Sequence, residues 1–274
     1  MYFSLICVMN NTCGLSYQRH GILLQPVWDY FLRRQELLLS PYLPAGLAFL
    51  SHLLLCAPFL ALDVVGRHCL ALNRYKISGN SETAVCMRLW FNSIIRIFWN
   101  YVICVLPATA LLHRLRNPEM PALAPTCGQA LWQIASCLFL FDALFYFWHV
   151  AMHRIPWLYR RVHQVHHQNP DVFALMAQDA SAAELLSLQT LALSSAALVG
   201  CHPLSEVVFH LLNMWLAVED HCGYDLPWAL HRILPFFGGS PFHQLHHRRF
   251  RGNYAPYFKH WDLLFDTYLT EESS

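Results

Sequence analysis

Histidines grouped at fixed spacings constrain the fold of this chain more than any other feature of its sequence. One pair has the form HxxxH, and two boxes, HQVHH and HQLHH, have the form HxxHH. Their eight histidines are His149, His153, His163, His166, His167, His243, His246 and His247. Because residues four apart share one face of a helix, the HxxxH pair can bind one metal ion. The adjacent histidines of a box point about 100° apart on a helix, so one box can reach two ions. We therefore predict that the two boxes face each other around a dinuclear metal site.

The alternative, eight converging imidazoles without metal, is unfavourable because many buried nitrogens would lack hydrogen-bond partners. His221, in the sequence VEDHCGY, is a plausible ninth ligand. Glu219 and Asp220 beside it could orient ligand imidazoles, although an ordinary solvated pair at a helix end would look the same. Isolated histidines such as His52 and His210 are interpreted as structural.

The donor set favours a redox-active pair of metals over a structural zinc site. Imidazole suits zinc, copper and iron alike, but a closed zinc site needs four ligands and usually includes cysteine. Eight or nine histidines without cysteine predict two metals and room for a further ligand. We expect iron with dioxygen as co-substrate, because a dry apolar setting suits oxidation of an unactivated C–H bond. Zinc is the expected alternative occupant in a purified protein.

The composition predicts an all-α integral membrane protein. Hydrophobic residues make up 56% of the 274 residues and charged residues 13%, and the mean hydropathy is +0.32. A soluble surface needs about twice that charge. The net charge of +1 gives no basis for nucleic-acid binding. Ten cysteines without a CxxC pair do not indicate a disulfide framework.

Three apolar runs come before the first HxxHH box, at 42–65, 89–112 and 130–150. Each can cross a hydrocarbon core of about 30 Å as a helix, so residues 42–150 are expected to form three transmembrane helices. Arg96 in the second run must snorkel or find a partner. Two shorter runs are joined by Gly200-Cys201-His202-Pro203, a reversal signal. They predict a helical hairpin at about 182–218 that dips into the bilayer or barely spans it.

One constraint sets the topology. If both boxes serve one site, an even number of crossings separates them, and three crossings place the N-terminus on the opposite side. The loop 66–88 carries four Lys or Arg residues and the loop 113–129 carries two, so the positive-inside rule makes the histidine region cytosolic. Residues 1–41 are then a lumenal lead-in, where the Asn10 sequon could be glycosylated. The apolar start, Met1 to Val8, is too short for a cleavable signal peptide and lacks a basic beginning.

The motifs WHVAMH, HQVHH and HQLHH, over about 139–267, resemble the fatty acid hydroxylase/sterol desaturase superfamily. Longer stretches, such as HRIPWLYRRVHQVHHQNPDVFAL and LHHRRFRGNYAPYFKHWDLLF, look like its members that hydroxylate a sterol side chain. Some fatty acid 2-hydroxylase relatives have a further HxxxH whose second histidine matches His221. Here Ala217 stands at the first position.

The resemblance implies a multi-pass monooxygenase of the endoplasmic reticulum membrane, with non-haem di-iron held by the box histidines of a catalytic region at 149–274. It implies cholesterol as substrate and side-chain carbon 25 as the position hydroxylated. The HPGG motif of a fused cytochrome b5 domain does not occur in the sequence, so electrons are expected from an external cytochrome b5 or an NADPH-dependent reductase.

Two other functions remain open from the sequence. A C4-methyl sterol oxidase or sterol desaturase would use the same metal core on another carbon. A histidine-rich metal transporter belongs to a different class. It would need polar residues at mid-membrane on several helices, whereas these boxes lie just beyond or between apolar runs.

Overall fold

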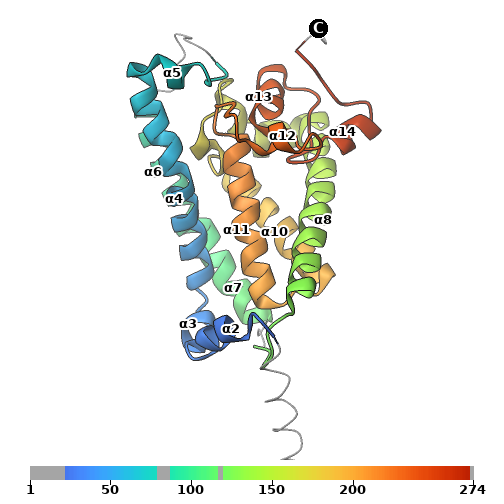
Figure 1. Ribbon diagram of the computed structural model, residues 1–274. Helices are drawn as coiled ribbons and strands as arrows, with labels where there is room; N and C mark the ends of the chain where they lie inside the picture. The colour runs from blue at the N-terminus through green and yellow to red at the C-terminus, as the bar shows by residue number, and fades with distance from the viewer. Residues whose placement is uncertain (1–21, 79–86, 117–119, 272–274) are drawn as a thin grey trace, which may run out of the picture.

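The computed structural model describes residues 22–78, 87–116 and 120–271 and contains only helices and loops in these ranges, apart from two isolated β-bridges. Figure 1 shows the arrangement. The α-helices are α2 (Gln25–Leu32), α3 (Gln35–Leu38), α4 (Leu43–Val65), α5 (Leu70–Asn73), α6 (Met87–Asn100), α7 (Leu106–Arg116), α8 (Cys127–Arg154), α9 (Pro156–Leu158), α10 (Ala182–Val199), α11 (Pro203–Asp220), α12 (Leu230–Ile233), α13 (Gly239–Arg249) and α14 (His260–Leu264). Shorter 3-10 or π segments are η1 (Gly66–His68), η2 (Tyr101–Val105), η3 (Tyr159–His163), η4 (His166–Gln168) and η5 (Ala174–Ala177).

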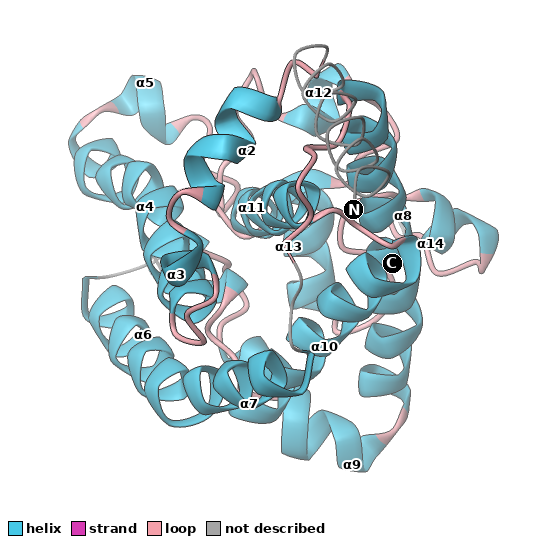
Figure 2. Cartoon of the chain, turned by 90° about the horizontal axis from the view of Figure 1, so that it is seen from below, coloured by secondary structure: helices cyan, strands magenta, loops and turns pink. Residues whose placement is uncertain are grey.

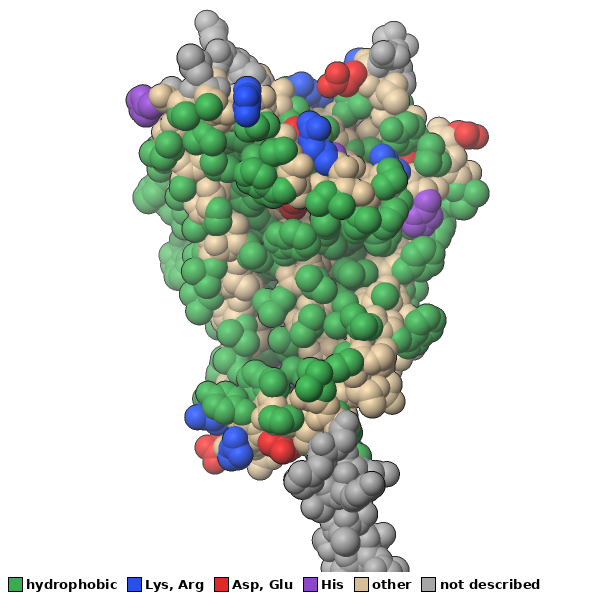
Figure 3. Space-filling view, in the orientation of Figure 1, with side chains coloured by type: hydrophobic (Ala, Val, Ile, Leu, Met, Phe, Trp, Pro, Cys, Tyr) green, Lys and Arg blue, Asp and Glu red, His purple; other side chains and the backbone are tan. Residues whose placement is uncertain are grey.

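Within the described ranges, four helices are long and apolar enough to cross a membrane. They are Leu43–Val65, Met87–Leu115, Cys127–Arg154 and Ala182–Val199, of which the second joins α6, η2 and α7. Large apolar side chains face outward on them, including Leu54, Trp132 and Leu198. Figure 3 shows a belt of hydrophobic side chains with charged ones gathered at its two ends. An outward apolar belt of this size belongs in lipid, so the predicted all-α membrane protein is confirmed.

Local sequence signals explain where α8 begins and ends. Thr126 caps the helix by accepting a hydrogen bond from the backbone N–H of Gln129, whose side chain accepts one from the backbone of Thr126. This reciprocal capping box satisfies two of the free N–H groups of the first turn. The helix ends at Arg154, and Ile155 is extended (φ −101°, ψ 106°). Ile155 precedes Pro156, which disfavours helical conformation there. The last two turns of α8 therefore present His149 and His153.

A hairpin of α10 and α11 reverses at Gly200. Ser181 caps α10 by accepting from the backbone N–H of Glu184. Gly200 ends the helix with φ of 70°, the left-handed conformation that glycine adopts without strain. Pro203 then starts α11, where its missing N–H is not needed.

Both helices of the hairpin pack against α8. α11 packs against α4, α8 and α13, and α10 packs against α8. One buried core lies between α4, α6 and η5 and includes Trp90 and Phe173. A second lies between α8, α10 and α11 and includes Phe141 and Phe209. Figure 2, seen from below, shows α11 between α4 and α8, with α6, α7 and α10 on the other side of the bundle. α12, α13 and α14 lie at the opposite end of the bundle from α2 and α3 (Figure 1).

Two buried carboxylates connect distant segments at the α13 end. Asp179, only 2% exposed, binds Arg96 at 2.7 Å between Nη2 and Oδ2. Arg96 has thus found a partner. Asp63 of α4 accepts hydrogen bonds from Lys76 at 2.9 Å, Trp90 at 3.0 Å and the Tyr224 hydroxyl at 2.8 Å. Because each oxygen is satisfied by donors from other segments, these carboxylates hold the helix ends in fixed positions.

Candidate metal centre

The first box is not a regular helix. Its histidines lie on η3 and η4, and His167 has non-helical angles (φ −88°, ψ 15°). The predicted regular helix is therefore wrong here, because the chain passes from a π segment to a 3-10 segment and leaves the helical conformation at His167 and then at Asn169. His163 and His167 nevertheless point one way and His166 another, so the box reaches two positions.

The second box lies on α13, which packs against α11. Gln244, 2% exposed, joins this box to the segment that follows the first one. Its Oε1 accepts a hydrogen bond from the backbone of Val172 at 3.0 Å, and its Nε2 donates to the carbonyl of Pro170 at 2.6 Å. His221 enters from the C-terminal end of α11. The two boxes are thus held together by a buried side chain that belongs to one of them.

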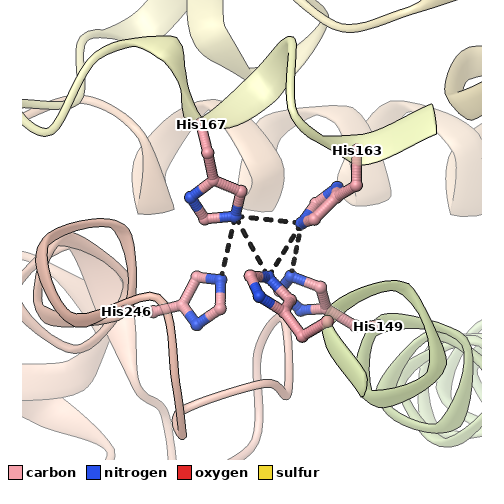
Figure 4. A group of neighbouring side chains, drawn as sticks. His149, His163, His167 and His246 are labelled. Carbon is pink, nitrogen blue, oxygen red and sulfur yellow. Dashed lines mark hydrogen bonds between the residues drawn. The ribbon is translucent and has the colours of Figure 1, made fainter. Parts of the chain in front are cut away.

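Five histidines form the first cluster: His149, His153, His163, His167 and His246. Their Nε2 atoms point towards one another, as Figure 4 shows for His149, His163, His167 and His246. The Nε2 of His163 lies 3.0 Å from that of His149, 3.1 Å from that of His153 and 2.9 Å from that of His167. The Nε2 of His246 lies 3.2 Å from that of His167. Both members of the HxxxH pair thus belong to one cluster.

Four histidines form the second cluster: His166, His221, His243 and His247. The Nε2 of His221 lies 3.2 Å from that of His166 and 2.9 Å from that of His243, and the Nε2 of His247 lies 3.1 Å from that of His243. The rings of His167 and His247 are 4.3 Å apart between centroids, so the clusters adjoin. The structure therefore brings together all nine histidines proposed from the sequence.

Hydrogen bonds at the outer ring nitrogens decide which nitrogen faces the cluster. Nδ1 of His149 donates to the carbonyl of Tyr254 at 2.7 Å, and Nδ1 of His246 donates to the carbonyl of Gly252 at 2.7 Å. Nδ1 of His221 donates to the carbonyl of Ala217, also at 2.7 Å. Because a carbonyl accepts only, the proton of each neutral ring must be on Nδ1. The lone pair of Nε2 is then free and points inward.

Asp262 holds the loop that supplies two of these carbonyls. Its buried carboxylate accepts hydrogen bonds from the backbone N–H groups of Tyr254 and Ala255, both at 2.8 Å. At Gly252 (φ 66°), an added Cβ would lie 2.5 Å from the carbonyl oxygen of Thr267. The loop therefore requires glycine at this position for its close packing.

Burial keeps the cluster imidazoles neutral. Removal from water is the largest cause of the lowered pKa of His163, His166, His167, His243 and His247, and neighbouring imidazoles add to it. Burial also lowers the pKa of His221 to about 4 and that of His246 to about 3. Neutral imidazole is the form that binds metal.

The donor geometry fits metal ions. Inward-facing lone pairs about 3 Å apart repel one another unless a cation or proton lies between them. A metal–imidazole bond is about 2.0–2.1 Å, so two nitrogens at right angles around one ion lie about 2.9 Å apart. The observed separations of 2.9–3.2 Å match this value. Each cluster can therefore hold one ion, with the two ions side by side.

Among the described residues, a buried carboxylate that contacts a cluster imidazole is that of Glu184, which the sequence did not suggest. Its Oε1 accepts from Nδ1 of His163 at 2.9 Å, and Glu184 is 2% exposed. Of the two acidic residues expected in this role, Glu219 approaches His231 at 3.9 Å, and Asp220 is buried and lines the cavity described below. The predicted glycosylation site Asn10 lies outside the described residues.

A cavity of about 1900 Å³ ends at the second cluster. It is lined there by His166, His221 and His243, and it extends along α4, α7, α10 and α11 to Trp28 and Phe31 of α2. Most of the lining is apolar. A long apolar cavity ending at metal-binding histidines suits an elongated lipid whose tip is brought to the metals.

Comparisons with known proteins agree with this picture. The family described as Fatty acid hydroxylase matches residues 134–267. The chain is 42% identical to the cholesterol 25-hydroxylase-like protein of Danio rerio over 246 residues, which cover 89% of this chain and 97% of that protein. It is 42% identical to the cholesterol 25-hydroxylase of Homo sapiens over 252 residues, 91% of this chain and 92% of that protein. The protein of the same name from Mus musculus is 41% identical over 249 residues, 90% of this chain and 83% of that protein. No solved structure matches.

Proposed function

The chain belongs to the fatty acid hydroxylase family, as a cholesterol 25-hydroxylase-like hydroxylating oxidoreductase, and on this premise we propose that it is a membrane-bound sterol monooxygenase. Cholesterol is the proposed substrate and 25-hydroxycholesterol the proposed product. The relatives named for this reaction support the substrate. The observation that carries the proposal is the long apolar cavity that ends at His166, His221 and His243.

Two iron ions are the proposed cofactor, one in each histidine cluster. Bound there, iron would supply activation of dioxygen and insertion of one oxygen atom into a C–H bond. The chain contributes the ligands and fixes their tautomers through the carbonyls of Ala217, Gly252 and Tyr254. The all-imidazole set without cysteine supports this choice, and zinc remains the expected replacement in a purified protein.

The cavity contributes orientation and exclusion of water. Leu185, Met214 and Ala217 are among the apolar residues that line it. A branched hydrocarbon tip can reach the cluster through such a lining, whereas a polar group would lose its hydration. The tertiary carbon of the sterol side chain has the most easily removed hydrogen at that tip. Carbon 25 is therefore the proposed position.

We propose that the protein lies in the endoplasmic reticulum membrane with its histidine clusters on the cytosolic face. Residues 1–41 would be lumenal, and 42–150 would contain three transmembrane helices. The catalytic region, 149–274, would include the α10–α11 hairpin. Loop charges support this orientation. Electrons would then come from a cytosolic donor, either cytochrome b5 or an NADPH-dependent reductase.

Product identification tests the proposal. Purified protein in lipid, loaded with iron and supplied with reductant and ¹⁸O₂, should convert cholesterol to 25-hydroxycholesterol carrying one ¹⁸O, as measured by mass spectrometry. The His166→Ala variant is the control and should give none. Oxidation of a C4 methyl group or formation of a new double bond would instead support the sterol oxidase or desaturase alternative. Failure to oxidise any sterol would refute the proposal.

A further inference from the structure

We propose that exposed arginines beside the five-histidine cluster form a docking surface for an acidic electron-carrier protein. This inference rests on the proposed function, which requires electrons from a separate donor. It names the surface that receives the donor and the chemistry of the partner that fits it. In each encounter the reduced carrier loses one electron and the proposed metal pair gains it, with no bond formed or broken.

The two segments that carry the HxxHH boxes are basic and contain no carboxylate side chain. Residues 143–170 include three arginines, residues 226–261 include four arginines and one lysine, and neither segment contains Asp or Glu. The exposed acidic residues Asp266 and Glu271 belong to the segment after α14. Protein surfaces usually mix both charges, so a region of one sign attracts partners of the opposite sign.

Three of these arginines follow residues at the C-terminal end of α8 and in η3. Arg154 comes directly after His153, a member of the five-histidine cluster. Arg160 and Arg161 come directly after Tyr159, whose ring centroid lies 5.5 Å from that of His153. All three arginines are exposed. Positive charge therefore lies on the outer side of this cluster.

Two more exposed arginines lie where α13 ends. Arg249 and Arg251 flank Phe250, whose ring centroid lies 5.3 Å from that of His167 in the same cluster. Arg248 is already paired with Asp171 and is left out of the set. We call the remaining five the arginine patch: Arg154, Arg160, Arg161, Arg249 and Arg251.

Phe250 gives the patch an apolar contact point. It has the left-handed conformation (φ 57°), which costs a residue with a Cβ about 1–2 kcal/mol relative to the right-handed one. Its large apolar side chain is 43% exposed. The ring thus faces outward on one side and contacts a cluster imidazole on the other. An exposed aromatic ring among charged side chains is typical of the centre of a protein interface.

The position of the patch favours a protein over a lipid as its partner. The hydrophobic belt runs along the long helices, whereas α13 lies at one end of the bundle (Figures 1 and 3). Lys and Arg side chains are visible at this end in Figure 3. A partner that approaches from outside the membrane meets this surface first. Positive charge there steers an acidic protein into contact and fixes its orientation.

Binding of a defined acidic carrier tests the assignment and does not depend on metal content. The probe is the soluble haem domain of cytochrome b5, and the full chain is held in phosphatidylcholine nanodiscs without anionic lipid. In Arg249→Glu/Arg251→Glu, the Kd for the probe should rise roughly tenfold or more at about 0.01 M salt. The effect should nearly vanish at about 1 M salt, because charges are then screened beyond about 3 Å.

The matched control reverses two exposed arginines at the other end of the bundle. Arg33 lies between α2 and α3, and Arg114 lies near the end of α7. Arg33→Glu/Arg114→Glu changes the net charge by the same amount and should leave the Kd within about twofold of the wild-type value.

Phe250→Gly separates the apolar contact from the charges. Glycine adopts the left-handed conformation without strain, so the backbone at the end of α13 is not disturbed. Loss of the ring should raise the Kd by about fivefold at both salt concentrations, because salt does not screen an apolar contact.

Three results would overturn the assignment while leaving the proposed function intact. The first is a reversal variant that binds the probe as the wild type does at low salt. The second is equal weakening in the control, which would show an effect of net charge alone. The third is a wild-type protein that does not bind the probe. Anionic lipid that co-purifies with the wild type but not with the reversal variant would then assign the patch to lipid headgroups.

Two further measurements keep the outcomes distinct. If the reversal variant is not recovered folded, Arg249→Gln/Arg251→Gln replaces it and should raise the Kd at least about threefold at low salt. Hydroxylation of cholesterol by the wild type with a small-molecule reductant bypasses the carrier. Its absence would refute the proposed function, whereas its presence leaves the docking surface to be decided by the binding data.

Discussion

Removing the carboxylate of Glu184 should weaken metal binding without touching a metal-binding nitrogen. Glu184 accepts a hydrogen bond of 2.9 Å from Nδ1 of His163, and both side chains are almost fully buried. In Glu184→Ala, His163 loses the partner that fixes its tautomer, and the proton can move to the nitrogen that faces the cluster. Loss of such a partner typically lowers metal affinity or activity 10–100-fold, or about 1.4–2.7 kcal/mol.

The conservative variant separates hydrogen bonding from charge. Glu184→Gln keeps an amide oxygen that can accept from Nδ1 of His163, so it should retain more metal than Glu184→Ala. Thr190→Val is the control on the same helix, since Thr190 is exposed and bonds only its own backbone turn. The measurement is the metal content of each purified variant after dialysis against graded chelator concentrations. Wild-type retention by Glu184→Ala at every concentration would show that this carboxylate does not support the site.

Three further predictions follow from buried groups. The pKa of His221 is about 4 and that of His246 about 3, below about 6.5 for histidine in an unfolded chain. Between about pH 4 and 6.5 the unfolded chain therefore binds more protons than the folded chain. The metal-free protein should lose stability as the pH falls through this range, by about 1.4 kcal/mol per pH unit for each histidine. A melting temperature that is constant over this range would contradict this. His52 is fully buried, and both its ring nitrogens lack hydrogen bonds to the described residues. The His52→Leu variant should therefore bind as much metal as the wild type and change in stability by less than about 1 kcal/mol. Metal loss on elemental analysis would make His52 part of the site. Arg96→Ala should lower stability by about 1.5–3 kcal/mol in denaturant unfolding, because it leaves the buried Asp179 without its charged partner; an unchanged midpoint would mean that the ion pair contributes nothing.

The sequence predicted the helical membrane fold and its reversal points well, because those depend on local signals. Runs of apolar residues are long enough to read directly, and Gly200 and Pro203 mark a turn through their own backbone preferences. The histidine spacings likewise indicated that one box could reach two positions. The first box does reach two positions although its backbone is irregular. The side chains of the adjacent residues His166 and His167 still point in different directions when the helix type changes.

What the sequence could not predict depends on contacts between distant segments. Glu184 lies twenty-one residues after His163, on a different helix, and nothing in its neighbourhood distinguishes it from an acidic residue in a first helical turn. Asp179 and Arg96 are eighty-three residues apart. The division of the second box, with His246 in one cluster and His243 and His247 in the other, depends on how α13 is rotated against α11.

The count of metal ions per chain tests the central claim most directly. Two adjacent histidine clusters predict two ions per chain in purified wild-type protein, measured by elemental analysis against an independent protein concentration. His246→Ala, in the five-histidine cluster, and His166→Ala, in the four-histidine cluster, should each lower the count towards one and abolish activity. A wild-type protein that binds a single ion at saturation, or none, would contradict the dinuclear site.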